Sequence, residues 1–264
     1  MRHHDEIARS WSDLHDRLFD VPIDANLGRF RTGFVFRGLD NAAHAPMQTS
    51  LMRLGGDPSS KERHLLRNFR KYAHLELEVR PSDSVWYWLA VGKHYGLPTR
   101  LLDWSYSPYV ALHFATANLQ QMNQDGLIWC VDADEAKTFL PRELSALLDA
   151  EGASVFTAEL LEGAAKSLEE LDSLPGEFVV FLEPPSLDAR IVNQFALFSL
   201  MSSPTALLDD WLRERSTTFR RIIIPASLKW EVRDKLDQAN ITERVLFPGL
   251  DGLSSWLKRY YFTK

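Results

Sequence analysis

The sequence predicts an α+β fold in one domain that spans residues 1–264. Segments in which apolar residues recur at helical spacing dominate the first half of the chain, and short apolar runs typical of strands dominate the second half. The strict alternation of strands and helices that marks a doubly wound parallel sheet is absent. We therefore expect a helix-rich N-terminal half and a mixed or antiparallel sheet built mostly from the C-terminal half.

Three helices are expected before residue 100, over residues 5–20, 59–77 and 83–96. In the first segment Ile7, Trp11, Leu14 and Leu18 recur at helical spacing, which predicts an amphipathic helix. Ser59 or Ser60 is the expected cap of the second helix, with Glu62 just inside it. Gly96 and Pro98 end the third, since glycine favours a helix C-terminus and proline cannot continue one.

A fourth helix is predicted to begin at Pro108, because Ser107 before it can cap the helix and proline suits the first helical position. Apolar runs predict strands over residues 32–40, 126–132, 176–183 and 220–225, and a last helix is expected over residues 253–261. The chain shows no internal repeat, no low-complexity tract and no linker. A single domain is therefore the simplest organisation.

The composition limits the partners and the location of the protein. The formal net charge of −6 argues against a nucleic acid held by charge, because such binders usually present a basic face. No segment reaches the roughly 18 apolar residues of a membrane span, and no apolar run follows the basic residues at the N-terminus. The single cysteine, Cys130, cannot form an internal disulfide, and we expect it to be a buried, inert residue rather than a catalytic thiol. A cytoplasmic protein without a membrane partner is the expectation.

Residues 93–115, "KHYGLPTRLLDWSYSPYVALHFA", place His94, Arg100, Asp103 and Trp104 close together in sequence. Arg100 lies in a segment that should be largely buried, and a buried guanidinium needs a partner. Asp103 is the nearest candidate in sequence. The alternative partner is an anionic ligand, for which the planar fork of donors is suited.

The other polar side chains of this segment have structural and chemical interpretations. His94 is either a hydrogen-bonded packing residue or an acid–base group, and no metal is expected because no second His or Cys stands at ligand spacing. Ser105 and Ser107 lack the glycine-flanked turn of a nucleophile elbow. Ser107 is better explained as a helix cap, and a capped helix N-terminus is also a natural anion site. The common glycine-rich phosphate loops are absent from the sequence.

Three motifs together resemble the FRG domain family, named for its Phe/Tyr-Arg-Gly motif. They are "FVFRGL" at residues 34–39, "HYGLPTRLLDWSYSPYVALHFA" at residues 94–115 and "RIVNQFALF" at residues 190–198. The third motif keeps an arginine and a glutamine four residues apart, Arg190 and Gln194. Ala196 stands where the family usually has glycine. The resemblance covers residues 34–200.

The resemblance implies a bacterial or phage-related intracellular protein whose motif layout is similar to a distant version of the ADP-ribosyltransferase plan. In that plan an arginine on a first strand is followed by an aromatic-and-hydroxyl motif and by a late Glu or Gln. Arg37, Trp104 with Ser105, and Gln194 match these elements by order. The third position is glutamine where most active transferases have glutamate, and Glu183 is a nearby carboxylate that could serve instead.

The residue types suit cleavage of the nicotinamide glycosidic bond of NAD, which passes through an oxocarbenium-like state. Arg37 and Arg100 would hold the pyrophosphate, Trp104 or Tyr106 would stack on nicotinamide, and Gln194 would hold the ribose. The candidate catalytic residues are Arg37, His94, Asp103 and Gln194. The candidate residues for binding NAD are Arg37, Gly38, Arg100, Trp104, Ser105, Tyr106 and Arg190.

The expected function is therefore an NAD-binding, ADP-ribosyltransferase-like activity, either ADP-ribosyl transfer or NAD glycohydrolysis, in a toxin or phage-defence effector. Its partner is a small nucleotide ligand, and a protein or nucleic-acid acceptor stays open. One alternative is an FRG module that binds or senses a nucleotide without catalysis. The other is a phosphoester hydrolase that uses His94 and Asp103.

Overall fold

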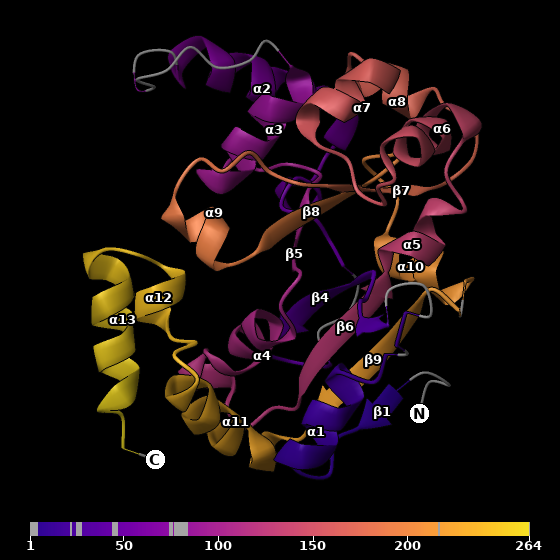
Figure 1. Cartoon of the computed structure of the whole chain (residues 1–264). Helices are drawn as coiled ribbons and strands as arrows, with labels where there is room; N and C mark the ends of the chain where they lie inside the picture. The colour runs from indigo at the N-terminus through magenta and orange to yellow at the C-terminus, as the bar shows by residue number, and fades with distance from the viewer. Residues whose placement is uncertain are drawn as a thin grey trace.

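The structure is a computed structural model that describes residues 5–21, 23–24, 28–43, 47–73, 76, 84–215 and 217–263. Its centre is a seven-stranded mixed sheet in the order β1-β9-β6-β4-β5-β8-β7, in which only β1 and β9 run parallel (Figure 1). The strands are β1 (Asp5–Ile7), β4 (Phe34–Leu39), β5 (Leu102–Ser105), β6 (Gly126–Asp132), β7 (Val179–Leu182), β8 (Ala196–Met201) and β9 (Phe219–Ile224). Two short strands, β2 (Ile23–Asp24) and β3 (Arg29–Phe30), pair separately.

The helices in the first 140 residues are α1 (Trp11–Leu18), α2 (Pro58–Ala73), α3 (Val85–His94), α4 (Pro108–Thr116) and α5 (Ala133–Lys137), with 3₁₀ turns at Met52–Leu54 and Leu119–Gln121. The later helices are α6 (Arg142–Glu151), α7 (Ala158–Ala164), α8 (Leu168–Asp172), α9 (Ala189–Asn193), α10 (Leu208–Arg213), α11 (Ala226–Gln238), α12 (Glu243–Leu246) and α13 (Leu250–Tyr260). The α+β class is confirmed.

The distribution of strands differs from the prediction, because β1, β4, β5 and β6 all precede residue 133. The segment 5–20, expected to be one helix, begins as β1, and its helix starts only at Trp11 after the Ser10 cap. β1 and β5 are three and four residues long. Strands this short carry too few alternations to stand out in sequence, and pairing with distant strands is what makes them extended.

The two faces of the sheet are covered differently. One face packs on α5 and α10 through a core that includes Trp129 and Trp211. On the other face, α1, α4 and α11 cover one end around Ile128, whereas α2, α3, α6, α7 and α8 cover the end formed by β7 and β8 around Trp88. Figure 1 shows these two helix groups above and below the middle of the sheet. The second face is thus covered by two separate groups of helices.

The predicted helix at Pro108 is confirmed as α4, and its cap is Ser107, whose hydroxyl accepts a hydrogen bond from the Val110 backbone N–H at 3.4 Å. Cys130 is fully buried on β6, and burial raises the pKa of its thiol to about 12. A thiol with such a pKa is protonated at neutral pH and is a poor nucleophile. The expectation of an inert core cysteine agrees with this environment.

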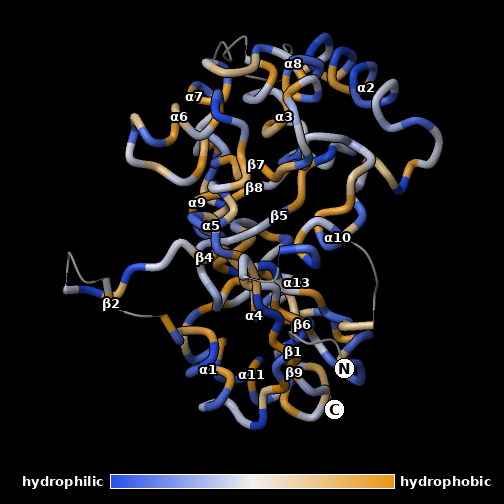
Figure 2. Tube along the Cα trace, turned by 90° about the vertical axis from the view of Figure 1, so that its right-hand side faces the viewer, coloured by the Kyte–Doolittle hydropathy of each residue, from blue (hydrophilic) through white to orange (hydrophobic). Residues whose placement is uncertain are grey.

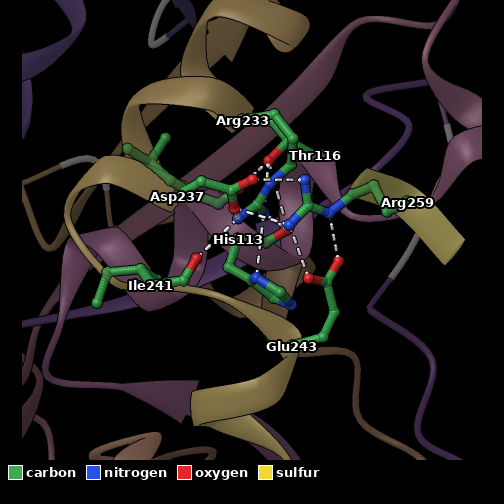
Figure 3. Close-up of polar contacts among 8 residues, drawn as sticks. His113, Thr116, Arg233, Asp237, Ile241, Glu243 and Arg259 are labelled. Atoms are coloured by element: carbon green, nitrogen blue, oxygen red, sulfur yellow. Dashed lines mark hydrogen bonds and ion pairs between the residues drawn. The ribbon is translucent and has the colours of Figure 1, made fainter. Parts of the chain in front are cut away.

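A buried polar network fixes the C-terminal helices against α4 and α11 (Figure 3). Arg259 of α13 binds Glu243 of α12 at 2.6 Å and Asp237 of α11 at 2.7 Å. Arg233 of α11 lies 3.0 Å from Nδ1 of His113 on α4. These contacts join four helices, so α12 has a defined position beside α9, which borders the candidate site.

Candidate functional site

A pocket of about 560 Å³ lies at a seam in the sheet, between β4 and β5. These two strands share one residue pair, Phe36 with Ser105, whereas β4 and β6 share six pairs. The pocket is lined by Phe36, Arg37, Gly38, Lys93, His94, Tyr95, Gly96, Asp103, Trp104, Ser105, Val110, Ala111, Phe114, Arg190, Ile191, Gln194, Ala196 and Phe198. All three sequence motifs therefore contribute to one concave site, which is where ligands usually bind.

Arg37 joins the two strands at the seam. Its Nη1 donates to the backbone carbonyl of Asp103 at 2.5 Å, while its Nε is buried and has no hydrogen-bond partner among the described residues. Phe36 and Gly38 face α4, so the alternation of the strand directs Arg37 to the opposite face, from which the guanidinium reaches the seam. Burial lowers the pKa of Arg37, although Asp103 opposes that effect. Arg37 lines the pocket, but one of its donors is already used to close the sheet.

Gly38 allows α4 to contact β4 directly. A Cβ at this position would lie 1.8 Å from the carbonyl oxygen of Ala111 and 2.9 Å from the backbone nitrogen of Ala115. No side chain fits in that space, so glycine is required for packing as well as being part of the pocket wall. The Arg-Gly dipeptide thus closes the seam and seats the helix that forms one side of the site.

His94 and Asp103 both reach the pocket, but they do not form a pair with each other. His94 Nε2 lies 2.8 Å from Oδ2 of Asp188, and Asp103 binds Lys93 Nζ at 2.7 Å. Asp188 also caps α9 by accepting from the Ile191 N–H. Partial burial would raise the pKa of Asp188, but the Ile191 N–H and His94 outweigh it and the pKa is lowered. A carboxylate that stays ionised can orient the imidazole and stabilise its protonated form.

The expected pairing of Arg100 with Asp103 is wrong. Arg100 is buried and binds Glu62 of α2 at 2.6 Å and Asp172 of α8 at 2.5 Å. Arg100 does not line the pocket at the seam. Arg37 and Gln194 both line the pocket, whereas Arg100, which was expected to hold the pyrophosphate together with Arg37, joins α2 to α8 instead.

The aromatic candidates have mainly structural partners. Trp104 is buried, its indole N–H donates to Ser199 Oγ at 2.8 Å, and its ring packs edge-on against Phe181. Tyr106 is not among the residues that line the pocket, and its hydroxyl donates to Glu183 at 2.6 Å. Burial and Glu183 raise the pKa of Tyr106. Glu183 is thus held by Tyr106 rather than placed in the pocket wall.

Ser105 and Gln194 organise the backbone on one side of the pocket. The Ser105 hydroxyl donates to the Gln194 carbonyl at 2.7 Å and accepts from the Ser107 N–H. Gln194 follows α9 as its C-cap residue, not within a strand, and its side-chain amide donates to the Leu246 carbonyl of α12 at 2.9 Å. Phe195 after it has a φ of 45°, a strained value for a bulky residue. Gln194 therefore connects α9 to α12 and borders the pocket at the same time.

Arg190, on α9, lies at the exposed edge of the pocket with its guanidinium 5.0 Å from the centre of the Phe247 ring. Together with Arg37 and Lys93 it gives the lining three basic side chains against the single carboxylate of Asp103. Such an excess of positive charge favours an anionic ligand.

Four residues at or beside the pocket were not found from the sequence: Lys93, Tyr95, Phe114 and Asp188. Tyr95 and Phe114 are large and partly exposed, at 63% and 40%. Asp188 carried one signal, since an Asp before a helical segment is a typical cap. That signal predicts the start of a helix. It does not predict that the Asp188 carboxylate contacts His94, which lies 94 positions earlier in the chain.

Within the part of the chain that the structure describes, no group of three or more His, Cys, Asp or Glu side chains could hold a metal ion. Among the same residues, no helix has the length and apolar character needed to cross a membrane. The pocket lining itself offers an imidazole paired with a carboxylate, three cationic side chains and two partly exposed aromatic rings.

Comparison with known proteins identifies the first two motifs. Searches of curated proteins and of solved structures give no match. Residues 32–124 match the FRG domain, and this range contains the Arg37-Gly38 strand and the His94–Ala115 segment but ends before Arg190 and Gln194. The chain therefore carries an FRG domain over residues 32–124.

Proposed function

We propose that the pocket at the β4–β5 seam binds an anionic nucleotide, with NAD as the first candidate, and promotes cleavage of its ribosyl–nicotinamide bond. One observation carries this proposal: three motifs that are far apart in sequence line one pocket with an excess of cations. Arg190 and Lys93 are suited to the phosphates, since both side chains offer charged donors. Tyr95 and Phe114 offer aromatic surface for a planar ring.

In this proposal His94 and its partner Asp188 supply the acid–base chemistry. Water or an acceptor hydroxyl attacks the ribosyl carbon as nicotinamide leaves with the electrons of the broken bond. The attacking group loses a proton, and an imidazole oriented by a carboxylate is suited to accept it. One N–H of the Gln194 side-chain amide donates to the Leu246 carbonyl, so the amide oxygen and the second N–H are left for a contact with the ribose.

The His94–Asp188 contact also favours a second candidate, hydrolysis of a phosphoester. The sequence suggested that such a hydrolase would use His94 together with Asp103. In the structure Asp103 binds Lys93, and His94 binds Asp188. With Asp188 as the orienting carboxylate, His94 would activate water against a phosphorus centre held by Arg190. The two candidates use the same pocket and differ in the bond that is broken.

Incubation of the purified protein with NAD, followed by chromatography, separates the candidates. Release of nicotinamide supports ribosyl chemistry, whereas release of AMP together with nicotinamide mononucleotide supports attack of water on phosphorus, here at the pyrophosphate bond of NAD. His94→Asn should lower either turnover by about 10²-fold or more, and His64→Asn, an exposed histidine on α2, serves as the control. NAD binding without any product, with water or a host lysate as acceptor, would support a binding module instead.

A further inference from the structure

Helix α2 carries a row of basic side chains that the pocket does not use. Arg63, Arg67, Arg70 and Lys71, here called the basic stripe, follow each other at spacings of four, three and one residues. These spacings place them on one side of the helix. The one acidic residue of α2, Glu62, is buried and binds an arginine from another segment, so it cannot balance the stripe.

The stripe is electrostatically unfavourable for the isolated helix. Arg63 and Arg67 are four residues apart, as are Arg67 and Lys71, and like charges at this spacing destabilise a helix. The chain as a whole carries a formal net charge of −6, so this concentration of positive charge does not reflect a basic protein. In Figure 2, α2 lies at one extremity of the molecule and is largely hydrophilic. A ligand of opposite charge would remove the repulsion.

The stripe borders a groove of about 350 Å³. The other wall of the groove is formed by the segment that leads into α8. The apolar part of the lining consists of the side chains of Leu66, Val85 and Leu168. The lining consists of Arg63, Leu66, Arg67, Arg70, Val85, Lys166, Ser167, Leu168 and Glu169. Four cations therefore meet one carboxylate in a groove separate from the pocket at the seam.

The single carboxylate neutralises little of this charge. Glu169 lies 3.5 Å from Arg63, and both side chains are more than half exposed, so the ion pair is weak. Within the described part of the chain, Arg67 and Lys166 show no ion pair with a carboxylate, and Arg70 lies 5.7 Å from the centre of the Trp88 ring. At least two cations of the groove are thus available to a ligand.

We propose that this groove binds a chain of phosphate groups, supplied either by a free oligophosphate or by the backbone of a nucleic acid. Arg63 and Arg67 are separated by about 6 Å along the helix axis, and Lys166 lines the same groove. Guanidinium groups bind phosphate through two parallel donors. Three cationic side chains along one groove match a linear series of phosphates better than a single anion.

The proposal does not depend on the function assigned to the pocket. Binding at the groove should persist in Arg37→Gln, which alters the seam, and should be lost in the double variant Arg63→Gln/Arg67→Gln. Lys258→Gln is the matched control, because Lys258 is an exposed cation on α13, well below α2 in Figures 1 and 2. Each variant's melting temperature shows that the fold is retained.

The test is isothermal titration calorimetry with inorganic tripolyphosphate, with a short single-stranded oligothymidylate and with a polyglutamate peptide. We expect tripolyphosphate to bind, and the double variant to bind it at least about tenfold more weakly, with an affinity that falls as salt rises. Binding of the oligonucleotide as well identifies the nucleic-acid source, and its failure to bind identifies the free oligophosphate. Tripolyphosphate affinity equal in the double variant and in Lys258→Gln, or equally tight binding of polyglutamate, would overturn the proposal.

Discussion

Arg37 donates a 2.5 Å hydrogen bond to the backbone carbonyl of Asp103, across the seam where β4 and β5 share a single residue pair. The guanidinium thus takes the place of the backbone hydrogen bonds that a regular pair of strands would make. The same side chain lines the pocket, and its Nε has no hydrogen-bond partner within the described part of the chain. The structural role of Arg37 and the ligand-binding role that we propose for it can be separated by experiment.

Arg37→Gln should weaken the binding of NAD or ADP-ribose by at least about tenfold, since a charged donor next to the ligand is lost. It should also lower the free energy of unfolding by about 1–3 kcal/mol, because the Asp103 carbonyl loses its partner. Ligand-induced shifts of the melting temperature measure the first effect and urea unfolding the second. Arg53→Gln removes a nearby positive charge outside the pocket lining and is the control.

If Arg37→Gln and Arg53→Gln reduce the ligand-induced shift equally, the effect is one of general charge. A variant that loses stability and keeps the full shift would show that Arg37 serves only to close the sheet.

Gly38→Ala should destabilise the protein by about 1–3 kcal/mol or more, because the added methyl group would overlap the Ala111 carbonyl and force α4 away from β4. Gly163→Ala is the matched control. A Cβ at Gly163 in α7 meets only Leu147, at 3.9 Å, so alanine should be neutral or stabilise the helix by up to about 1 kcal/mol. Urea unfolding of both variants measures the difference, and equal stabilities would contradict the close packing.

Glu62→Ala should reduce the free energy of unfolding by about 3–5 kcal/mol, since it removes a carboxylate from the buried guanidinium of Arg100. Asp103→Ala should cost at most about 1 kcal/mol, because Asp103 is 60% exposed in its pair with Lys93. Chemical unfolding of the two variants ranks them. A larger loss for Asp103→Ala would mean that the ion pairs of Arg100 contribute little.

Gln194→Glu tests whether Gln194 occupies the position of the glutamate of active transferases or serves only a structural role. The Gln194 amide donates to the Leu246 carbonyl, and a carboxylate would instead repel that oxygen. We therefore expect Gln194→Glu to lose about 1–3 kcal/mol of stability and to gain no turnover of NAD. Thermal unfolding and nicotinamide release measure both properties. Increased turnover in Gln194→Glu would show that the position acts on the ribose.

The stability of the protein should fall as the pH is lowered from 6.5 to 5 through His113. Burial, together with Arg233, lowers the pKa of His113 to about 3, well below the usual 6.5. Below pH 6.5 the unfolded state therefore binds a proton at this histidine, whereas the folded state stays unprotonated there down to about pH 3. The free energy of unfolding should fall by about 1.4 kcal/mol for each unit by which the pH is lowered in this range. Urea unfolding at several pH values checks this slope. His113→Asn should have a flatter profile in this window, and an unchanged slope would contradict the assignment.

The sequence alone was enough to predict the start of one helix, the burial of the cysteine and the FRG domain. Ser107 followed by Pro108 predicts the start of α4 because cap and first-turn preferences are properties of adjacent residues. The burial of Cys130 follows from the apolar run around it. The Arg37-Gly38 and His94–Ala115 motifs were enough to predict the FRG domain that the family comparison confirms. Each of these signals lies within one short stretch of chain.

Only the tertiary structure decided which side chains meet. Arg100 lies three residues from Asp103, yet it binds Glu62 and Asp172, which are 38 and 72 residues away. His94 binds Asp188 at a separation of 94 residues. Partners of buried charges depend on the path of the whole chain, because desolvation makes a buried charge select the carboxylates that packing brings to it rather than those nearest in sequence. The pocket itself depends on the seam between β4 and β5, and no local pattern encodes where two strands separate.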